Sequence, residues 1–448
     1  MTVRIQQGRV WSMDPQQEIV LKQTWGILLK FFGYELSLKL DDLESGKSLV
    51  NSAPGIPGGR RAESVSSISK DSLSLSSGGS SFAFQSSNTN IKSVYYSLET
   101  GSMDDASSGA FSLYHQEEHP ALSRYIPEDL HRSLWSALKN CSPDNFLLRI
   151  IRLANNDRKV TLKWVAEVLD FRINKYPVTD IVFEGDAGPY FEGKSPKLIE
   201  AFRRNEVYVR GNSRSGCPLI VVRAKEHFRS NCPDADYEKL IIMHFEWSFL
   251  AMQEFKRGVD QAHVLFDLTG FTLKNADFHA VKMVVKLFQR IYPDCVEKVY
   301  IHKAPKIFSV MWNIIVKWMA PHLREKLIFT HTYEELRKYI ESKYIPKSLG
   351  GKDKHIPTYI EPTEFNCKKK EPDALLGNLL RQRDDLTIKY IENTIKWIEA
   401  TTPEESKAYL DEKVRLSKAR AQNYVFLDPY LRMRGPHDRN GEILSISY

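Results

Sequence analysis

One stretch of this chain has the residue types of a phosphate-binding loop. Residues 188–195 read Gly-Pro-Tyr-Phe-Glu-Gly-Lys-Ser and match the pattern G-x-x-x-x-G-K-[ST]. Such a loop holds a nucleotide by pointing successive backbone N–H groups at its phosphates. Pro189 lacks one of these donors, and the carboxylate of Glu192 would repel the phosphates. The apolar run before the motif, residues 181–183, is very short for a strand. We therefore expect a connecting loop that leads into a helix over residues 196–204.

Other catalytic patterns are missing from the sequence. The histidines and carboxylates show neither the spacing of a nucleophile triad nor an HExxH motif. His263 and His302 fall in expected strands, and we interpret both as structural. The five cysteines are scattered without CxxC or Cys/His metal spacing, which indicates reduced thiols. A net charge of +7 and no aromatic–basic alternation give no support for nucleic-acid binding. We expect no enzyme activity, no metal and no cofactor.

Residues 263–351 are expected to form an α/β unit, and this unit must position any functional residues. Apolar runs of strand length alternate with segments of helical periodicity. The expected order is strand, helix, strand, helix, strand, over residues 263–271, 276–291, 298–304, 307–319 and 326–331. Strands that are separated by helices favour a mostly parallel sheet with right-handed crossovers.

The helix expected over residues 307–319 is apolar on nearly all sides. Such a helix must be buried or must meet lipid, and it is shorter than the about 20 residues that span a bilayer. Ordinary core is one interpretation. The tryptophans Trp312 and Trp318, with Lys306 and Lys317 beside them, favour a helix at a membrane interface. No window has 18 apolar residues and the first residues lack an apolar signal core, so neither a transmembrane helix nor a signal peptide is expected.

Composition divides the chain into parts. The Ser-, Gly- and Asn-rich segment after residue 45 cannot bury enough apolar area to offset the entropy of ordering it. We expect a helical N-terminal segment over residues 1–45, a disordered linker over 46–118, a helical lobe over 119–185, a sheet-containing domain over 186–357, and a helical C-terminal extension over 358–448.

A series of motifs follows in order over roughly residues 126–357. They are Leu147-Leu148-Arg149-x-x-Arg152, Phe171-Arg172, Gly216-x-Pro218-Leu219-x-Val221, Phe266-Asp267-Leu268-x-Gly270-Phe271, Tyr292-Pro293-Asp294, His302-Lys303-Ala304-Pro305-x-Ile307-Phe308, Lys326-Leu327-Ile328-Phe329 and Tyr344-Ile345-Pro346-x-x-Leu349-Gly350-Gly351. Together they resemble the CRAL-TRIO lipid-binding family, and within it the Sec-fourteen-like phosphatidylinositol transfer proteins. Two terminal motifs are similar to those of the larger fungal CSR-type member: Val20-Leu21-Lys22-Gln23-x-Trp25 and Asn423-Tyr424-x-x-Leu427-Asp428-Pro429-Tyr430-x-Arg432.

The resemblance implies a CRAL-TRIO fold of the α/β class. It comprises a helical N-terminal lobe, a mostly parallel sheet that floors a hydrophobic lipid cavity, and a gate helix that closes it. The gate helix would contain Ile307, Phe308, Met311, Trp312, Ile315, Trp318 and Met319. The implied function is non-enzymatic: a lipid monomer is extracted and transferred between membranes. The alternative is a sensor whose lipid occupancy regulates a partner in lipid metabolism or trafficking.

The resemblance also implies a polar site for the lipid headgroup. Lys326 matches the family's lysine, and Asp294 stands where the family has a glutamate. Arg149 and Arg152 are candidate substitutes for an arginine that the family carries at the position of Ala154.

Two further family positions are replaced by Ala320 and Leu323. Loss of an arginine removes bidentate phosphate binding. The expected cargo is therefore phosphatidylinositol, another phospholipid, or a less polar sterol- or isoprenoid-like lipid. We expect a cytoplasmic monomer that associates transiently with intracellular membranes such as microsomes or endosomes, with bound lipid as its only ligand.

Overall fold

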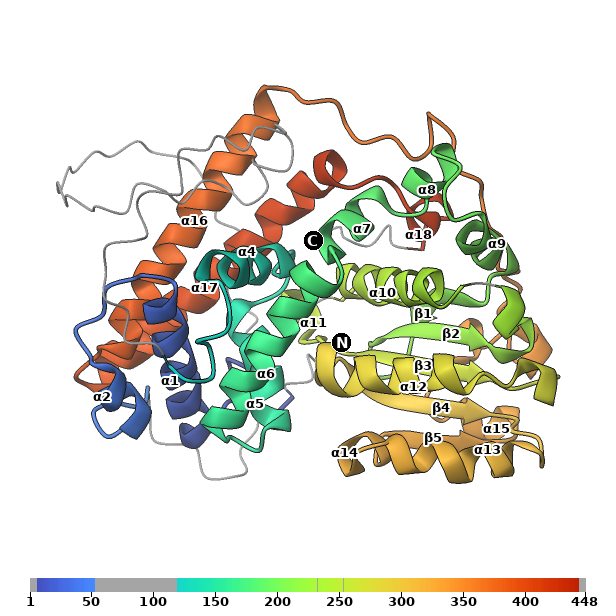
Figure 1. Ribbon diagram of the computed structural model, residues 1–448, viewed down its shortest axis with the longest axis horizontal. Coiled ribbons are helices and arrows are strands. Elements are labelled where there is room, and N and C mark those ends of the chain that lie inside the picture. Colours follow the sequence, from blue (N-terminus) through green and yellow to red (C-terminus); the bar gives the residue numbers. More distant parts are fainter. Residues whose placement is uncertain (1–5, 53–118, 232, 253, 443–448) are drawn as a thin grey trace.

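The computed structural model describes residues 6–52, 119–231, 233–252 and 254–442 of the chain. A helical lobe and a sheet-containing lobe lie side by side (Figure 1). Most of the linker expected over residues 46–118 falls outside the described residues.

Helices from both ends of the chain form the helical lobe. They are α1 (Pro15–Phe31), α2 (Leu40–Ser45), α4 (Pro127–Ala137), α5 (Pro143–Leu153), α6 (Arg158–Asp170), α16 (Ala374–Ile398) and α17 (Pro403–Leu431). Trp25, Trp135 and Trp397 lie in one shared core. Lys22 is buried there and donates from Nζ to the carbonyl oxygen of Trp397 at 2.6 Å. The N-terminal segment and the C-terminal extension therefore pack together, although the sequence separates them widely.

The sheet has five strands in the order β1-β2-β3-β4-β5. They are β1 (Val207–Asn212), β2 (Pro218–Arg223), β3 (Ala262–Asp267), β4 (Val296–His302) and β5 (Leu327–Thr330). Only the pairing of β1 with β2 is antiparallel, and the pairings β2–β3, β3–β4 and β4–β5 are parallel. The expected α/β fold with a mostly parallel sheet is confirmed.

Helices cover the sheet and join it to the other lobe. They are α7 (Val178–Glu184), α8 (Ala187–Phe191), α9 (Pro196–Arg204), α10 (Asp234–Leu250), α11 (Glu254–Arg257), α12 (Phe278–Lys286), α13 (Phe308–Ile315), α14 (Pro321–Arg324), α15 (Tyr333–Leu336) and α18 (Pro436–Arg439). Side chains alternate between the two faces of each strand. Val264 and Val299 belong to the large core with α10 and α12, whereas Leu265 and Tyr300 pack on the other face against Leu336.

The helices predicted around the parallel strands are shorter and less regular than the apolar pattern suggested. The helix expected over residues 276–291 is α12 followed by a π-helical turn, Leu287–Ile291. The helix expected over residues 307–319 is α13 followed by a 3-10 turn, Val316–Trp318. Hydrophobic periodicity located these elements but not their irregular ends.

The motif that imitates a phosphate-binding loop is a connector, as expected. Residues 178–184 form a helix rather than a strand, and α8 takes up the first part of the motif. Lys194 is exposed and pairs with Glu192 at 2.9 Å. α9 then begins at Pro196 and ends at Arg204, the range predicted for this helix. Since the motif's backbone N–H groups do not form a cradle after a strand, the structure gives no support to a nucleotide site here.

Candidate functional site

A large apolar cavity lies between the sheet and the helices α10, α12 and α13. Its empty space is about 1310 Å³, the open mouth included. The walls combine sheet residues with residues from all three helices: Ile220, Val264, Phe266, Val299 and Ile301 from the strands, Ile241 and Phe245 from α10, Val281, Val284 and Val285 from α12, and Phe308, Met311, Trp312 and Ile315 from α13. The site suits long hydrocarbon chains, because few lining groups would lose a hydrogen bond to water.

The predicted gate helix covers this cavity with one side only. Phe308, Met311 and Ile315 of the predicted set are buried and face the cavity, and Met319 also lines it. Trp312 lies between the rings of Phe308 and Phe329, with centroids 6.2 Å and 4.9 Å away. Trp318 contacts Phe278 at 6.0 Å.

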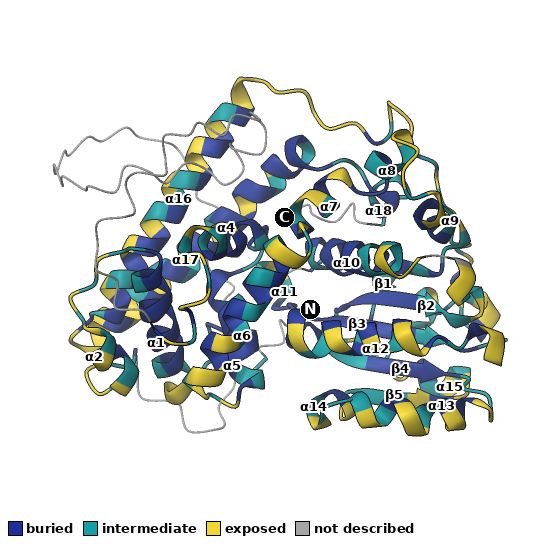
Figure 2. Cartoon of the chain, in the orientation of Figure 1, coloured by how far each residue is buried: buried dark blue, intermediate teal, exposed yellow. Residues whose placement is uncertain are grey.

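The opposite side of this helix is apolar and exposed. Ile307, Val310 and Ile314 have 40%, 61% and 41% of their surface exposed. Figure 2 shows the contrast between this helix, at the edge of the sheet lobe, and α10, which is mostly buried from Leu240 onward. The apolar pattern around the whole helix therefore has two causes: one face closes the cavity and the other meets the surroundings.

His227 and Asp277 line the cavity near the carboxyl end of β2 and form a small polar group with Glu206, which sequence reasoning missed. His227 lies between two carboxylates: Nδ1 is 3.1 Å from Glu206, and Nε2 is 3.2 Å from Asp277. Burial opposes protonation, but the hydrogen bonds with Glu206 and Asp277 outweigh it and raise the pKa of His227. Because Glu206, His227 and Asp277 are distant in the sequence, no sequence motif predicts this group.

The predicted headgroup residues meet at the amino ends of the parallel strands. Asp294 precedes β4 and accepts from Arg152 Nε at 2.8 Å and from Lys326 Nζ at 2.7 Å. Lys326 also donates to the carbonyl oxygen of Val296 at 2.6 Å. Burial opposes ionisation of Asp294, but Arg152 and Lys326 outweigh it and hold the pKa of this carboxyl below its usual value.

Arg149 joins this network through a second carboxylate. Asp260 lies 3.6 Å from Arg149 Nε and 2.8 Å from Arg9 Nη2. Arg9 comes from the segment before α1, so the N-terminus completes the group. Together four cations surround two carboxylates. The cations outnumber the carboxylates, so the cluster has a surplus of positive charge. Burial raises the pKa of the nearby Glu254 to about 7, and even the ionised form of this third carboxyl leaves a positive surplus.

The charged network adjoins the cavity without lining it. Leu323 and Leu327, on either side of Lys326 in the chain, are cavity residues. Arg149 lines a smaller pocket beside it, together with Tyr292 and Cys295. The ring of Tyr292 stacks on Phe245, 5.0 Å away, which lines the large cavity. This aromatic pair therefore lies between the large cavity and the pocket that Arg149 lines.

Of the three replaced family positions, one lines the cavity. Leu323 is buried in the cavity wall, whereas Ala154 ends α5 and Ala320 precedes α14. Arg172, which belongs to one of the family motifs, is used for packing: it donates to the buried Glu246 at 2.6 Å across the two lobes. The positive charge next to this end of the cavity therefore comes from Arg9, Arg149, Arg152 and Lys326.

The chain is similar to known proteins over most of its length. Residues 203–351 match the model of the CRAL/TRIO domain. The chain is 31% identical to the phosphatidylinositol transfer protein CSR1 of Eremothecium gossypii, over 99% of this chain and 100% of that protein. A CRAL-TRIO domain-containing protein of Schizosaccharomyces pombe is 26% identical over 97% of this chain and 92% of its own. The crystal structure of Sfh5 superposes with a TM-score of 0.38 at 13% identity, over 54% of this chain and 78% of that one.

The matches to the Eremothecium and Schizosaccharomyces proteins extend beyond the sheet-containing lobe. Alignment with the Eremothecium protein includes the terminal helices that pack together in the helical lobe. Among the helices that the structure describes, none is long and apolar enough to cross a membrane.

Proposed function

Because this chain belongs to the CRAL-TRIO family, we propose that it takes one phospholipid into the cavity under α13 and transfers it between membranes. The observation that carries the proposal is the large apolar cavity under α13, a helix that is apolar on both faces. The name of the Eremothecium relative, a phosphatidylinositol transfer protein, supports a phospholipid as the cargo class.

The cavity makes extraction of a lipid energetically feasible. Burial of an acyl chain stabilises it by about 0.8 kcal/mol for each CH₂ group relative to water. Two chains in the cavity therefore recover most of the hydrophobic free energy that they lose on leaving the bilayer. Movement of α13 would expose Phe308, Met311 and Ile315. At a membrane surface these side chains meet hydrocarbon instead of water, so opening costs less there than in solution. The membrane itself therefore acts as the opening signal.

The charged network favours an anionic headgroup over a neutral one. Arg149, Arg152 and Lys326 are held by carboxylates in this state, and the surplus positive charge can pair with the negative charge of a phosphate. A phosphate would compete with Asp294 for Lys326. A sterol- or isoprenoid-like cargo would leave this network as it is, and is the less favoured alternative.

The transfer step itself makes and breaks no covalent bond and needs no cofactor. We propose that the protein works as a monomer, visits membranes only transiently, and is peripherally associated with intracellular membranes. Its role differs from that of a sensor in one respect: a sensor binds lipid but releases it poorly.

The first test is mass spectrometry of lipids that co-purify with the full chain from a eukaryotic host, followed by transfer between donor and acceptor vesicles. Recovery of an anionic phospholipid together with net transfer supports the proposal. Recovery of a sterol-like lipid alone would overturn the headgroup assignment. Bound phospholipid without transfer would favour the sensor.

A further inference from the structure

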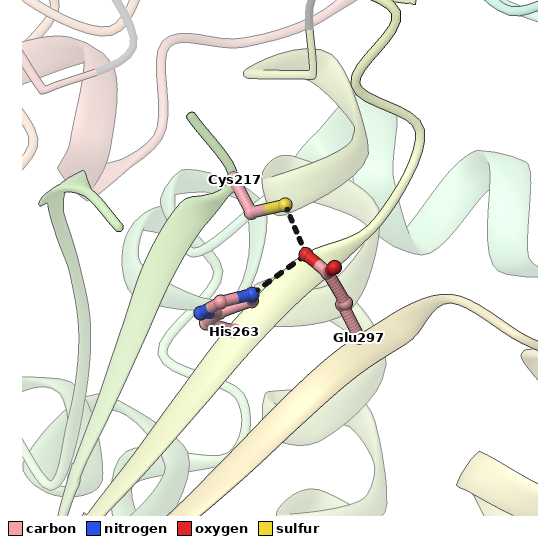
Figure 3. A group of neighbouring side chains, drawn as sticks. All are labelled: Cys217, His263 and Glu297. Atoms are coloured by element: carbon pink, nitrogen blue, oxygen red, sulfur yellow. Dashed lines mark hydrogen bonds and ion pairs between the residues drawn. The ribbon is translucent and has the colours of Figure 1, made fainter. Parts of the chain in front are cut away.

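Three potential metal ligands converge on the face of the sheet that points away from the cavity. Cys217 directly precedes β2, His263 is the second residue of β3, and Glu297 is the second residue of β4. Their ligand atoms all lie within 4.8 Å of one another. Figure 3 shows the thiol of Cys217 and the ring of His263 pointing at one carboxylate oxygen of Glu297.

A fourth oxygen completes the group. Ser215 Oγ lies 3.1 Å from Glu297 Oε2, 3.4 Å from His263 Nε2 and 3.5 Å from Cys217 Sγ. The carboxylate oxygen is itself 2.9 Å from His263 Nε2 and 3.2 Å from Cys217 Sγ. Five of the six separations among these four donor atoms are therefore between 2.9 Å and 3.5 Å, and the sixth, between Cys217 Sγ and His263 Nε2, is no more than 4.8 Å. Bonds of about 2.0–2.3 Å around a tetrahedral Zn²⁺ put donor atoms about 3.3–3.6 Å apart, so small shifts admit the ion.

We propose that Cys217, His263 and Glu297 form a zinc site, with Ser215 or a water molecule at the fourth corner. A thiolate, an imidazole and a carboxylate together suit a borderline-soft divalent ion such as Zn²⁺, whereas Mg²⁺ and Ca²⁺ prefer oxygen ligands alone. The charges also balance: a thiolate and a carboxylate neutralise the two charges of the ion. Binding displaces the proton of the Cys217 thiol to solvent.

The surroundings of His263 are those of a metal ligand. Tyr300 Oη lies 2.9 Å from Nδ1, which leaves Nε2 directed at the cluster. Metal-binding histidines commonly hold their second nitrogen in a hydrogen bond of this kind, because it fixes the ring and its tautomer. Tyr300 is fully buried, so this partner is held firmly in place.

The backbone also places the ligands with little freedom. Ser215 and Cys217 belong to the turn between β1 and β2, where Gly216 has φ +87°, a conformation that suits glycine. The turn is fastened by Ser213, whose N–H donates to the carbonyl oxygen of Cys217 at 2.8 Å, and by the N–H of Arg214, which donates to Tyr339 at 2.8 Å. The pairing register of β3 and β4 shifts between Ala262 and His263, beside Glu297.

Hydrogen bonds to the Glu297 carboxylate compete with metal binding. Burial opposes ionisation of Glu297, but hydrogen bonds from His263, Cys217 and Ser215 outweigh it and lower the pKa of this carboxyl to about 2. Burial and Glu297 raise the pKa of the Cys217 thiol to about 12. Zinc binding must therefore remove this proton, and the proton that His263 Nε2 donates to Glu297 must move to Nδ1, which then donates to Tyr300 Oη. Glu297 keeps 16% of its side chain exposed, which gives an ion a route from solvent.

The site would tie the β1–β2 turn to the starts of β3 and β4. Such a site acts on the stability of the sheet and not on the lipid, because it lies on the face opposite to the cavity. The inference is therefore independent of the proposed lipid transfer.

The test uses the untagged full chain, with Zn²⁺ and Co²⁺ as the only probes. We expect one equivalent of zinc by mass spectrometry after dialysis, and a cobalt form with a thiolate charge-transfer band and the visible bands of a tetrahedral ion. Cys217→Ala should lose the stoichiometric metal and this band. Cys367→Ala, which removes a buried thiol elsewhere, should keep both.

A second variant keeps the test informative if Cys217→Ala does not fold. Tyr300→Phe removes one hydroxyl and should weaken Zn²⁺ binding about 10- to 100-fold, as loss of such an outer hydrogen bond does in other zinc sites. Added Zn²⁺ should raise the melting temperature of the wild type, and do so less for Tyr300→Phe. Folded wild-type protein without stoichiometric zinc, or a cobalt form without the thiolate band, would overturn the proposal.

Discussion

The outward face of α13 offers a direct test of membrane contact, because its side chains can be changed without altering the cavity wall. Ile307, Val310 and Ile314 have 40%, 61% and 41% of their surface exposed. Full burial of a side chain of this kind gains about 1.5–3 kcal/mol. Scaled by the exposed fractions, insertion into a membrane surface is worth about 1 kcal/mol for each residue and about 3 kcal/mol for the three.

The double variant Val310→Ser with Ile314→Ser removes two of these three contributions. We expect it to lose about 2 kcal/mol of membrane affinity, which corresponds to about 30-fold weaker binding to vesicles. Transfer between vesicles should fall by a similar factor when most of the protein is free in solution. The cavity wall is unchanged, so lipid that is already bound should remain bound.

The assay combines sedimentation with phospholipid vesicles and transfer of a fluorescent phospholipid, with circular dichroism to confirm the fold. A matched control, Ile356→Ser with Leu375→Ser, removes apolar side chains that are 78% and 47% exposed away from α13. This control should bind and transfer as the wild type does. Wild-type transfer by the folded α13 variant, or an equal loss in both variants, would refute the role of this face.

Three further changes test the charged groups. Lys326→Ala should weaken loading of an anionic phospholipid at least about tenfold more than loading of a neutral lipid, and an equal loss of both in a lipid-binding assay would contradict a charge role. Burial raises the pKa of Glu254 to about 7 from 4.5, so folding takes up a proton between these values and stability falls as pH rises through them. Glu254→Gln should remove this pH dependence, which lowers the unfolding free energy of the wild type by about 3 kcal/mol by pH 7. Urea unfolding of both proteins at pH 5 and pH 8 measures the difference. Asp144→Ala leaves Lys413, its buried partner at 2.9 Å, uncompensated; urea unfolding should show a loss of about 3–5 kcal/mol, and a loss below about 1 kcal/mol would show that this pair is unimportant.

The elements around the cavity were predictable because they depend on nearby residues. The spacing of apolar residues identified α12 and α13, and short apolar runs identified β3, β4 and β5. The same local chemistry rejected the imitation phosphate loop, where Pro189 and Glu192 oppose phosphate binding. The predicted headgroup residues are gathered in one network, but whether they hold a lipid stays a prediction.

The pairing of charges was beyond the reach of any local pattern. Arg9 reaches Asp260 across 251 residues, and Asp294 takes Lys326 and Arg152 as partners because the strand order and the packing of the lobes bring them together. The sequence also left undecided which side of α13 faces the cavity, since apolar residues lie on both sides.

The group of Cys217, His263 and Glu297 shows most clearly what the sequence does not reveal. Each residue stands near the start of a different strand, and no ligand spacing links them in the sequence. The sequence by itself determined the elements, the overall α/β class and the apolar character of α13, because these follow from short-range periodicity. The tertiary structure alone decided which distant polar groups share a site, because contacts across strands and lobes depend on the order in which the whole chain packs.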